Sequence, residues 1–90
     1  MNYNGVFLPV MDSGWVEITP SAANTPTKKA VKFNRAFGKK PYVVVSPMTS
    51  EIGTKVKGVA AQNFTTTGFD VWLNRSDTTA TGVSWIAIGI

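Results

Sequence analysis

Apolar and polar residues alternate with a period of two in short segments that recur about every ten residues along this chain. In the clearest of them, residues 69–74, Phe69, Val71 and Leu73 are predicted to point inward. A period of two is that of a strand with one buried face, and no segment has the longer period of an amphipathic helix. Gly, Pro, Ser, Asn and Thr separate the segments, as expected for turns. The pattern predicts an all-β fold, a six-stranded antiparallel β-sandwich.

Each expected strand carries its own burial pattern. Val31 and Phe33 share one face, and Gly58 breaks the alternation in a way that is typical of a β-bulge. Residues 42–46 are apolar enough for a central strand, and residues 83–90 are apolar on both faces, so they must lie in mid-sheet or under a neighbouring subunit. The six strands are expected within residues 13–19, 29–37, 42–46, 55–63, 69–74 and 83–90.

Ninety residues suffice for one domain only, because a smaller core could not offset the entropy of ordering the chain. We assign residues 1–12 to a lead-in segment or linker and residues 13–90 to the domain. The N-terminus lacks the charged region of a signal peptide, and the apolar residues 6–10 are too short and contain a proline. No signal peptide and no membrane insertion are therefore expected.

The composition leaves little room for catalysis. There is no cysteine and no histidine, so the commonest nucleophile–base pairs and metal ligands are missing. The five acids are scattered, although Glu51 and Asp77 could approach each other in loops as a glycosidase pair does. We expect no enzyme activity, no catalytic residues, no metal and no cofactor.

Nine basic residues against five acidic ones give a net charge of +4. The lysines could bind an anionic surface, but lysines on strand edges more often prevent edge-to-edge pairing. Base-stacking aromatics do not interleave with them, so nucleic acid is not an expected partner. The cluster consists of Lys28, Lys29, Lys32, Lys39 and Lys40.

Two features are candidates for ligand contact. Trp72 falls on the outward face of its strand with Asp70 and Asn74, where it could stack on a sugar ring or be buried between subunits. The polar residues 74–77 could form an Asx-type turn or contact a ligand, led by Arg75, whose planar fork can hold two hydroxyls or a carboxylate.

The order of several motifs resembles the H-type lectin domain over residues 13–90. These are Gly14-Trp15, Lys29-Ala30-Val31-Lys32-Phe33, Pro41-Tyr42-Val43-Val44-Val45-Ser46, Thr67-Gly68-Phe69 and the closing Ser84-Trp85-Ile86-Ala87-Ile88-Gly89. The resemblance is strongest to the version found at the C-terminal ends of bacteriophage tail and baseplate proteins of Gram-positive hosts. It implies a β-sandwich that forms a homotrimer, sometimes doubled to a hexamer, on an extracellular virion tail or baseplate.

The resemblance also implies a sugar site between protomers. The family grips its sugar with the loop after the first strand and the loop before the last. The matching positions, with Trp72 added from its place on the outward face, are Asn24, Thr25, Trp72, Asn74, Arg75, Ser76 and Asp77. The first loop lacks the Gly-Arg-Asp group and the second lacks the Trp-His pair of the animal lectins, so the resemblance does not carry over their sugar specificity.

Two functions from different classes follow. The first is a carbohydrate-binding receptor-recognition module that binds host cell-wall or capsular polysaccharide. The alternative is a structural trimerisation or end-cap domain in which Trp72, Trp85 and the last strand form the interface and the loops are inert.

Overall fold

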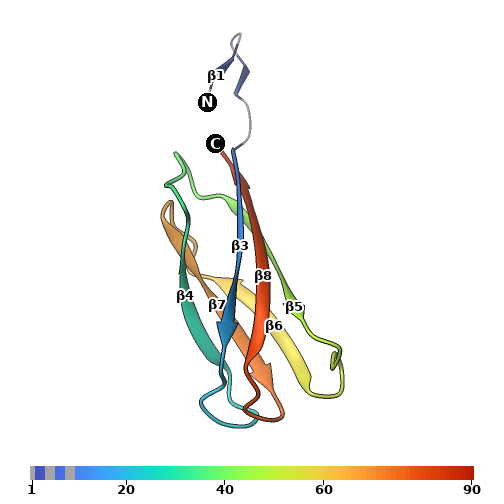
Figure 1. Cartoon of the computed structure of the whole chain (residues 1–90). Coiled ribbons are helices and arrows are strands. Elements are labelled where there is room, and N and C mark those ends of the chain that lie inside the picture. Colours follow the sequence, from blue (N-terminus) through green and yellow to red (C-terminus); the bar gives the residue numbers. More distant parts are fainter. Residues whose placement is uncertain (1, 4–5, 8–9) are drawn as a thin grey trace.

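The computed structural model describes residues 2–3, 6–7 and 10–90, and the side chains from Val10 onward. Six antiparallel strands form two three-stranded sheets, and no helix is present in these residues, which confirms the predicted β-sandwich (Figure 1). The six are β3 (Val10–Ile18), β4 (Thr27–Lys32), β5 (Tyr42–Met48), β6 (Val56–Gln62), β7 (Gly68–Arg75) and β8 (Thr81–Gly89). Two short strands, β1 (Asn2–Tyr3) and β2 (Val6–Phe7), pair only with each other.

The strand order is β3-β8-β5 in one sheet and β4-β7-β6 in the other. Strand β8 is therefore central, as its two apolar faces predicted. Strand β5 was expected to be central but lies at an edge. Pro47 explains its place, because a proline has no N–H to donate to a further strand and is tolerated at an edge.

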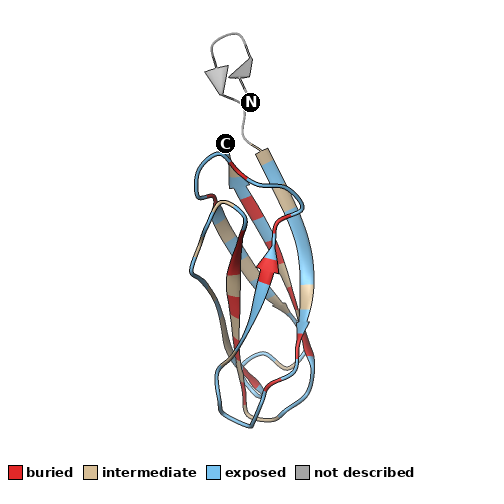
Figure 2. Ribbon diagram, turned by 90° about the vertical axis from the view of Figure 1, so that its left-hand side faces the viewer, coloured by how far each residue is buried: buried red, intermediate tan, exposed pale blue. Residues whose placement is uncertain are grey.

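The core lies between the two sheets, and in Figure 2 buried and exposed positions alternate along the strands. The predicted inward residues Phe69, Val71 and Leu73 are at most 3% exposed. The rings of Phe33 and Phe69 lie 5.7 and 5.6 Å from the Trp85 ring, and Trp85 is 4% exposed. Trp85 thus belongs to the core and not to a subunit interface, which corrects that part of the structural alternative.

The first long strand starts earlier than expected. Strand β3 begins at Val10, whereas the strand was predicted from Ser13 and residues 1–12 were left without one. Asp12 anchors this extension, since its carboxylate accepts hydrogen bonds from the backbone N–H and the side chain of Asn34 at 2.7 and 2.6 Å. Partial burial acts to raise the pKa of Asp12, but these bonds outweigh it and the pKa is lowered. Residues 1, 4–5 and 8–9 of the lead-in lie outside the described residues.

Two glycines explain local geometry. The pairing of β6 with β7 shifts register between Val56 and Gly58, which confirms the predicted bulge. Gly68 starts β7 where the backbone of β4 passes very close, and a Cβ there would collide with the carbonyl oxygen of Val31. Only glycine allows this approach of the two strands.

Candidate functional site

Three loops gather at one end of the sandwich, drawn at the bottom of Figure 1. They join β3 to β4, β5 to β6 and β7 to β8. The backbone N–H of Asn24 donates to the carbonyl of Arg75 at 2.6 Å, and the N–H of Ser76 donates to Lys55 at 2.9 Å. The fold therefore brings together the two loops that were predicted to form one site.

Arg75 does not face solvent. Its side chain is 2% exposed, and its guanidinium donates to Asp77 Oδ1 at 2.7 Å and to Glu51 Oε1 at 3.0 Å. A third bond runs from Nη1 to the hydroxyl of buried Thr81 at 2.7 Å. The expectation that Arg75 leads the contact with a ligand is therefore corrected, because every one of these donors is already directed at the protein.

The charges around Arg75 form a network that fixes the loops. The hydrogen bond from Arg75 lowers the pKa of Asp77 to about 2 against the opposing effect of burial, and backbone and cationic neighbours add to the lowering. Lys55 lies 3.7 Å from the same carboxylate. The network joins the β5–β6 loop, which carries Glu51, to the β7–β8 loop, which carries Asp77.

Glu51 and Asp77 do approach each other, but through the guanidinium that they share. A glycosidase pair needs one carboxyl group that holds a proton near neutral pH. Asp77, with its pKa lowered to about 2, cannot be that donor. Within residues 2–3, 6–7 and 10–90 no group of three or more potential metal-ligating side chains is close enough to hold an ion, and no helix is long and apolar enough to span a membrane.

The remaining loop residues are accessible. Asn24 and Thr25 are exposed, and Ser76 and Asp77 are half-buried. Asn24 has a φ of 55°, a left-handed conformation that asparagine adopts more readily than most residues. Thr25 uses its hydroxyl to donate to the carbonyl of Ala23 at 3.2 Å. These side chains form an ordered polar rim at the end of the sandwich.

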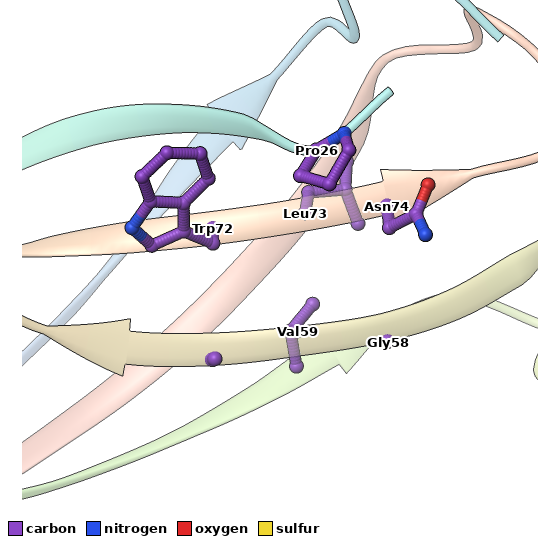
Figure 3. Close-up of a pocket in the computed structure, with 7 residues that line it drawn as sticks. Pro26, Gly58, Val59, Trp72, Leu73 and Asn74 are labelled. Carbon is purple, nitrogen blue, oxygen red and sulfur yellow. The ribbon is translucent and has the colours of Figure 1, made fainter. Parts of the chain in front are cut away.

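A hollow lies next to this rim, on the outer face of the β4-β7-β6 sheet (Figure 3). Its volume is about 220 Å³. Trp72 and Asn74 project into it from β7, and Pro26 of the β3–β4 connection lies beside them. The rest of the lining comes from Gly58, Val59, Ala60 and Leu73.

Two residues that line this hollow each carry a buried side-chain atom with no hydrogen-bond partner among the described residues: the indole Nε1 of Trp72, a donor, and the side-chain Oδ1 of Asn74, an acceptor. Both atoms are shielded from solvent, and an unpaired buried polar group costs free energy. A hydroxyl group can both donate and accept, so it is the kind of partner that both atoms lack.

A second surface was predicted only in part, through the last strand, which was expected to lie in mid-sheet or under a neighbouring subunit. Among the described residues, seven of the nine large apolar side chains that are exposed lie on the outer face of the β3-β8-β5 sheet. We call this set the apolar face: Met11, Trp15, Tyr42, Val44, Met48, Ile86 and Ile88. The signal in the sequence was that residues 42–46 and 83–90 are apolar at both odd and even positions, so that both faces of each strand carry apolar side chains.

The apolar face spans all three strands, with Ser13, Ser46 and Ser84 between its members. Met11, Ile88 and Tyr42 form one row across the three strands, and Trp15 and Met48 meet over Gly82. Trp15 is 61% exposed and Tyr42 is 84% exposed. With roughly 150–250 Å² for each aromatic side chain, these two alone expose about 200–350 Å². With the aliphatic side chains added, the face exceeds the apolar patches usual on monomers.

The chain was also compared with known proteins. No protein-family model matches it, and no curated protein is significantly similar to it.

Proposed function

We propose that this chain is a carbohydrate-binding, lectin-like receptor-recognition module that binds host cell-wall or capsular glycan. The observation that carries the proposal is the hollow lined by Trp72 and Asn74: Trp72 offers an aromatic ring and an unpartnered donor, and Asn74 an unpartnered acceptor. A sugar ring has an apolar C–H face for the indole and hydroxyls for the polar atoms. The hollow is shallow, which suits one unit of a polymer that extends over the surface.

The loop rim extends this site. Asn24 is held against the end of β7 by its hydrogen bond to Arg75, so the β3–β4 loop stands next to Asn74. In this proposal Asn24, Thr25, Ser76 and Asp77 contact neighbouring sugar units. Arg75 has a different role from the one expected: it positions the loops from inside and does not touch the sugar.

The resemblance to H-type lectin domains supports the setting of the proposal. On that basis the module belongs to the tail or baseplate of a bacteriophage, outside the cell, and acts as a homotrimer or a doubled trimer. The apolar face supports self-association independently, because water-exposed apolar surface of this extent is normally covered by a partner.

The apolar face also favours a second candidate function, a structural trimerisation or end-cap domain without a ligand. In that case the interface is formed by Trp15, Ile86 and their neighbours on the apolar face. Trp85 plays no part in it, since it is buried in the core, and neither does Trp72, which the structural alternative also named but which lies in the other sheet.

One pair of variants separates the two functions. Trp72→Ala removes the indole of the hollow and Trp15→Ala removes an indole of the apolar face. We expect Trp72→Ala to lower binding on a glycan array, or to host cell-wall fragments, by roughly ten-fold or more without a change in oligomer mass. Trp15→Ala should weaken the oligomer, measured by light scattering. An intact oligomer that binds no glycan would leave only the structural function standing.

A further inference from the structure

The hollow at Trp72 has a basic neighbour. Lys28 pairs with Trp72 across β4 and β7, and its Nζ lies 5.9 Å from the centroid of the indole ring. That distance is at the outer limit of a cation–π contact, so the ammonium group is only weakly held. Lys28 is exposed and forms no ion pair among the described residues.

No carboxylate competes for this ammonium at the hollow. None of the residues that line the hollow is acidic. The nearest acid on this face of β7 is Asp70, two residues along the strand, and its carboxylate accepts a hydrogen bond from Asn63 at 2.8 Å. Glu51 and Asp77, at the end of the sandwich, are bound to Arg75.

The other lysines of this strand are arranged differently. Lys29 donates to the backbone carbonyl of Glu17 at 2.9 Å, and Lys32 pairs with Gly68 at the far end of β7. Lys32 is four residues from Lys28 on the same face, which is about 13 Å along a strand. Lys28 is therefore the lysine of β4 whose ammonium is placed beside the hollow.

We propose that the hollow selects glycans whose sugar units carry a negative charge, a carboxylate or a phosphate, and that Lys28 is the residue that recognises it. This inference rests on the proposed function, because it names the class of ligand for the same site. The sugar ring lies on Trp72, its hydroxyls replace the missing partners of Asn74, and its anionic group pairs with Lys28. Ala60, which pairs with Trp72 on the neighbouring strand β6, is small and exposed.

The test compares ligands that differ only in charge. One pair is a galacturonic acid oligosaccharide and its neutral methyl ester, and the other is a mannan fragment with 6-phosphate and the same fragment after phosphatase treatment. We expect the charged member of at least one pair to bind more tightly, and Lys28→Gln to weaken that binding by about three- to ten-fold. Lys28→Arg should retain it. The pair that shows the difference identifies the anionic group as carboxylate or phosphate.

Lys32→Gln is the matched control, since it removes the same charge from the same face of the same strand. Equal losses in both variants would overturn the proposal, because they would indicate a diffuse effect of net charge. Equal binding of the charged and neutral ligands would also overturn it, and would leave the proposed function intact if Trp72→Ala still weakens binding. Failure of every ligand to bind the unmodified oligomer would overturn both.

Discussion

If the chain self-associates through the apolar face as proposed, a charge placed in the centre of that face should dissociate the oligomer. Ile86 is the position of choice, because it lies on the central strand β8 between Ser13 and Val44. Its side chain is 48% exposed, so about half of the 1.5–3 kcal/mol available from burying an isoleucine is still to be gained, or about 1 kcal/mol. The Ile86→Asp substitution forfeits this gain.

The new carboxylate adds a larger penalty. Desolvation of an ion at an interface costs several kcal/mol, and an aspartate stem is too short to bring the charge back to water. If the desolvation penalty is about 3 kcal/mol, the total loss of association free energy is about 4 kcal/mol for each protomer. A loss of this size raises a dissociation constant by about 1,000-fold. Sedimentation velocity over a dilution series should find monomer where the unmodified chain is assembled.

The control is Gln62→Asp, on the outer face of the other sheet. The two substitutions are matched, because each places a new carboxylate near an existing one. Asp70 lies opposite Gln62, and Asp12 lines the same surface hollow as Ile86. Circular dichroism should find both variants folded. An unchanged sedimentation coefficient in Ile86→Asp, or an equal loss of mass in Gln62→Asp, would refute the assignment of the apolar face to self-association.

Three further predictions concern the fold and the loop network. Gly68→Ala should lower the free energy of unfolding by about 2–3 kcal/mol, because its Cβ would collide with the Val31 carbonyl, whereas Gly58→Ala, which meets no neighbour, should have little effect in the same urea titration. Arg75→Lys should lower the melting temperature, since one ammonium cannot reach the three partners of the guanidinium; an unchanged melt would show that the network is dispensable. The lowered pKa of Asp77 means that its contribution to stability is present above its ordinary value of 3.8 and is lost as the pH falls through about 2. The difference in urea midpoint between the unmodified chain and Asp77→Asn should therefore shrink from pH 6 to pH 2, and a constant difference would contradict the ion pair.

The strands and their inward faces were predictable because they depend on local alternation. Phe69, Val71 and Leu73 were placed correctly from a period of two alone. The order of strands was not, because pairing joins residues far apart in the chain. Val44 illustrates the difficulty: an apolar residue covered by a second sheet layer and one left exposed on a sheet face have the same signature in a sequence.

The burial of Arg75 was within reach of the same reasoning. If the alternation of 69, 71 and 73 is continued by one step, residue 75 falls on the inward face, but the predicted strand stopped at Asn74. What the sequence could not supply was the set of partners. Glu51 is 24 residues away and Thr81 belongs to another strand. Only the fold therefore shows that the buried guanidinium of Arg75 has a carboxylate and a hydroxyl as partners.

The two outer faces of the sandwich differ in chemistry, and this difference gives the proposed assembly its geometry. Copies that pack through the β3-β8-β5 sheet must turn their β4-β7-β6 sheets outward, because the two sheets lie on opposite sides of one core. Each hollow at Trp72 then faces away from the axis of the oligomer, with Lys28 beside it, which differs from the site between protomers that the resemblance implies. A hollow this shallow can hold a single sugar unit only weakly, but several of them on a rigid oligomer bind one polymer surface at a high effective concentration. The two proposals, self-association and glycan binding, are therefore complementary, since the first would turn weak sites into stable adhesion that still reverses one site at a time.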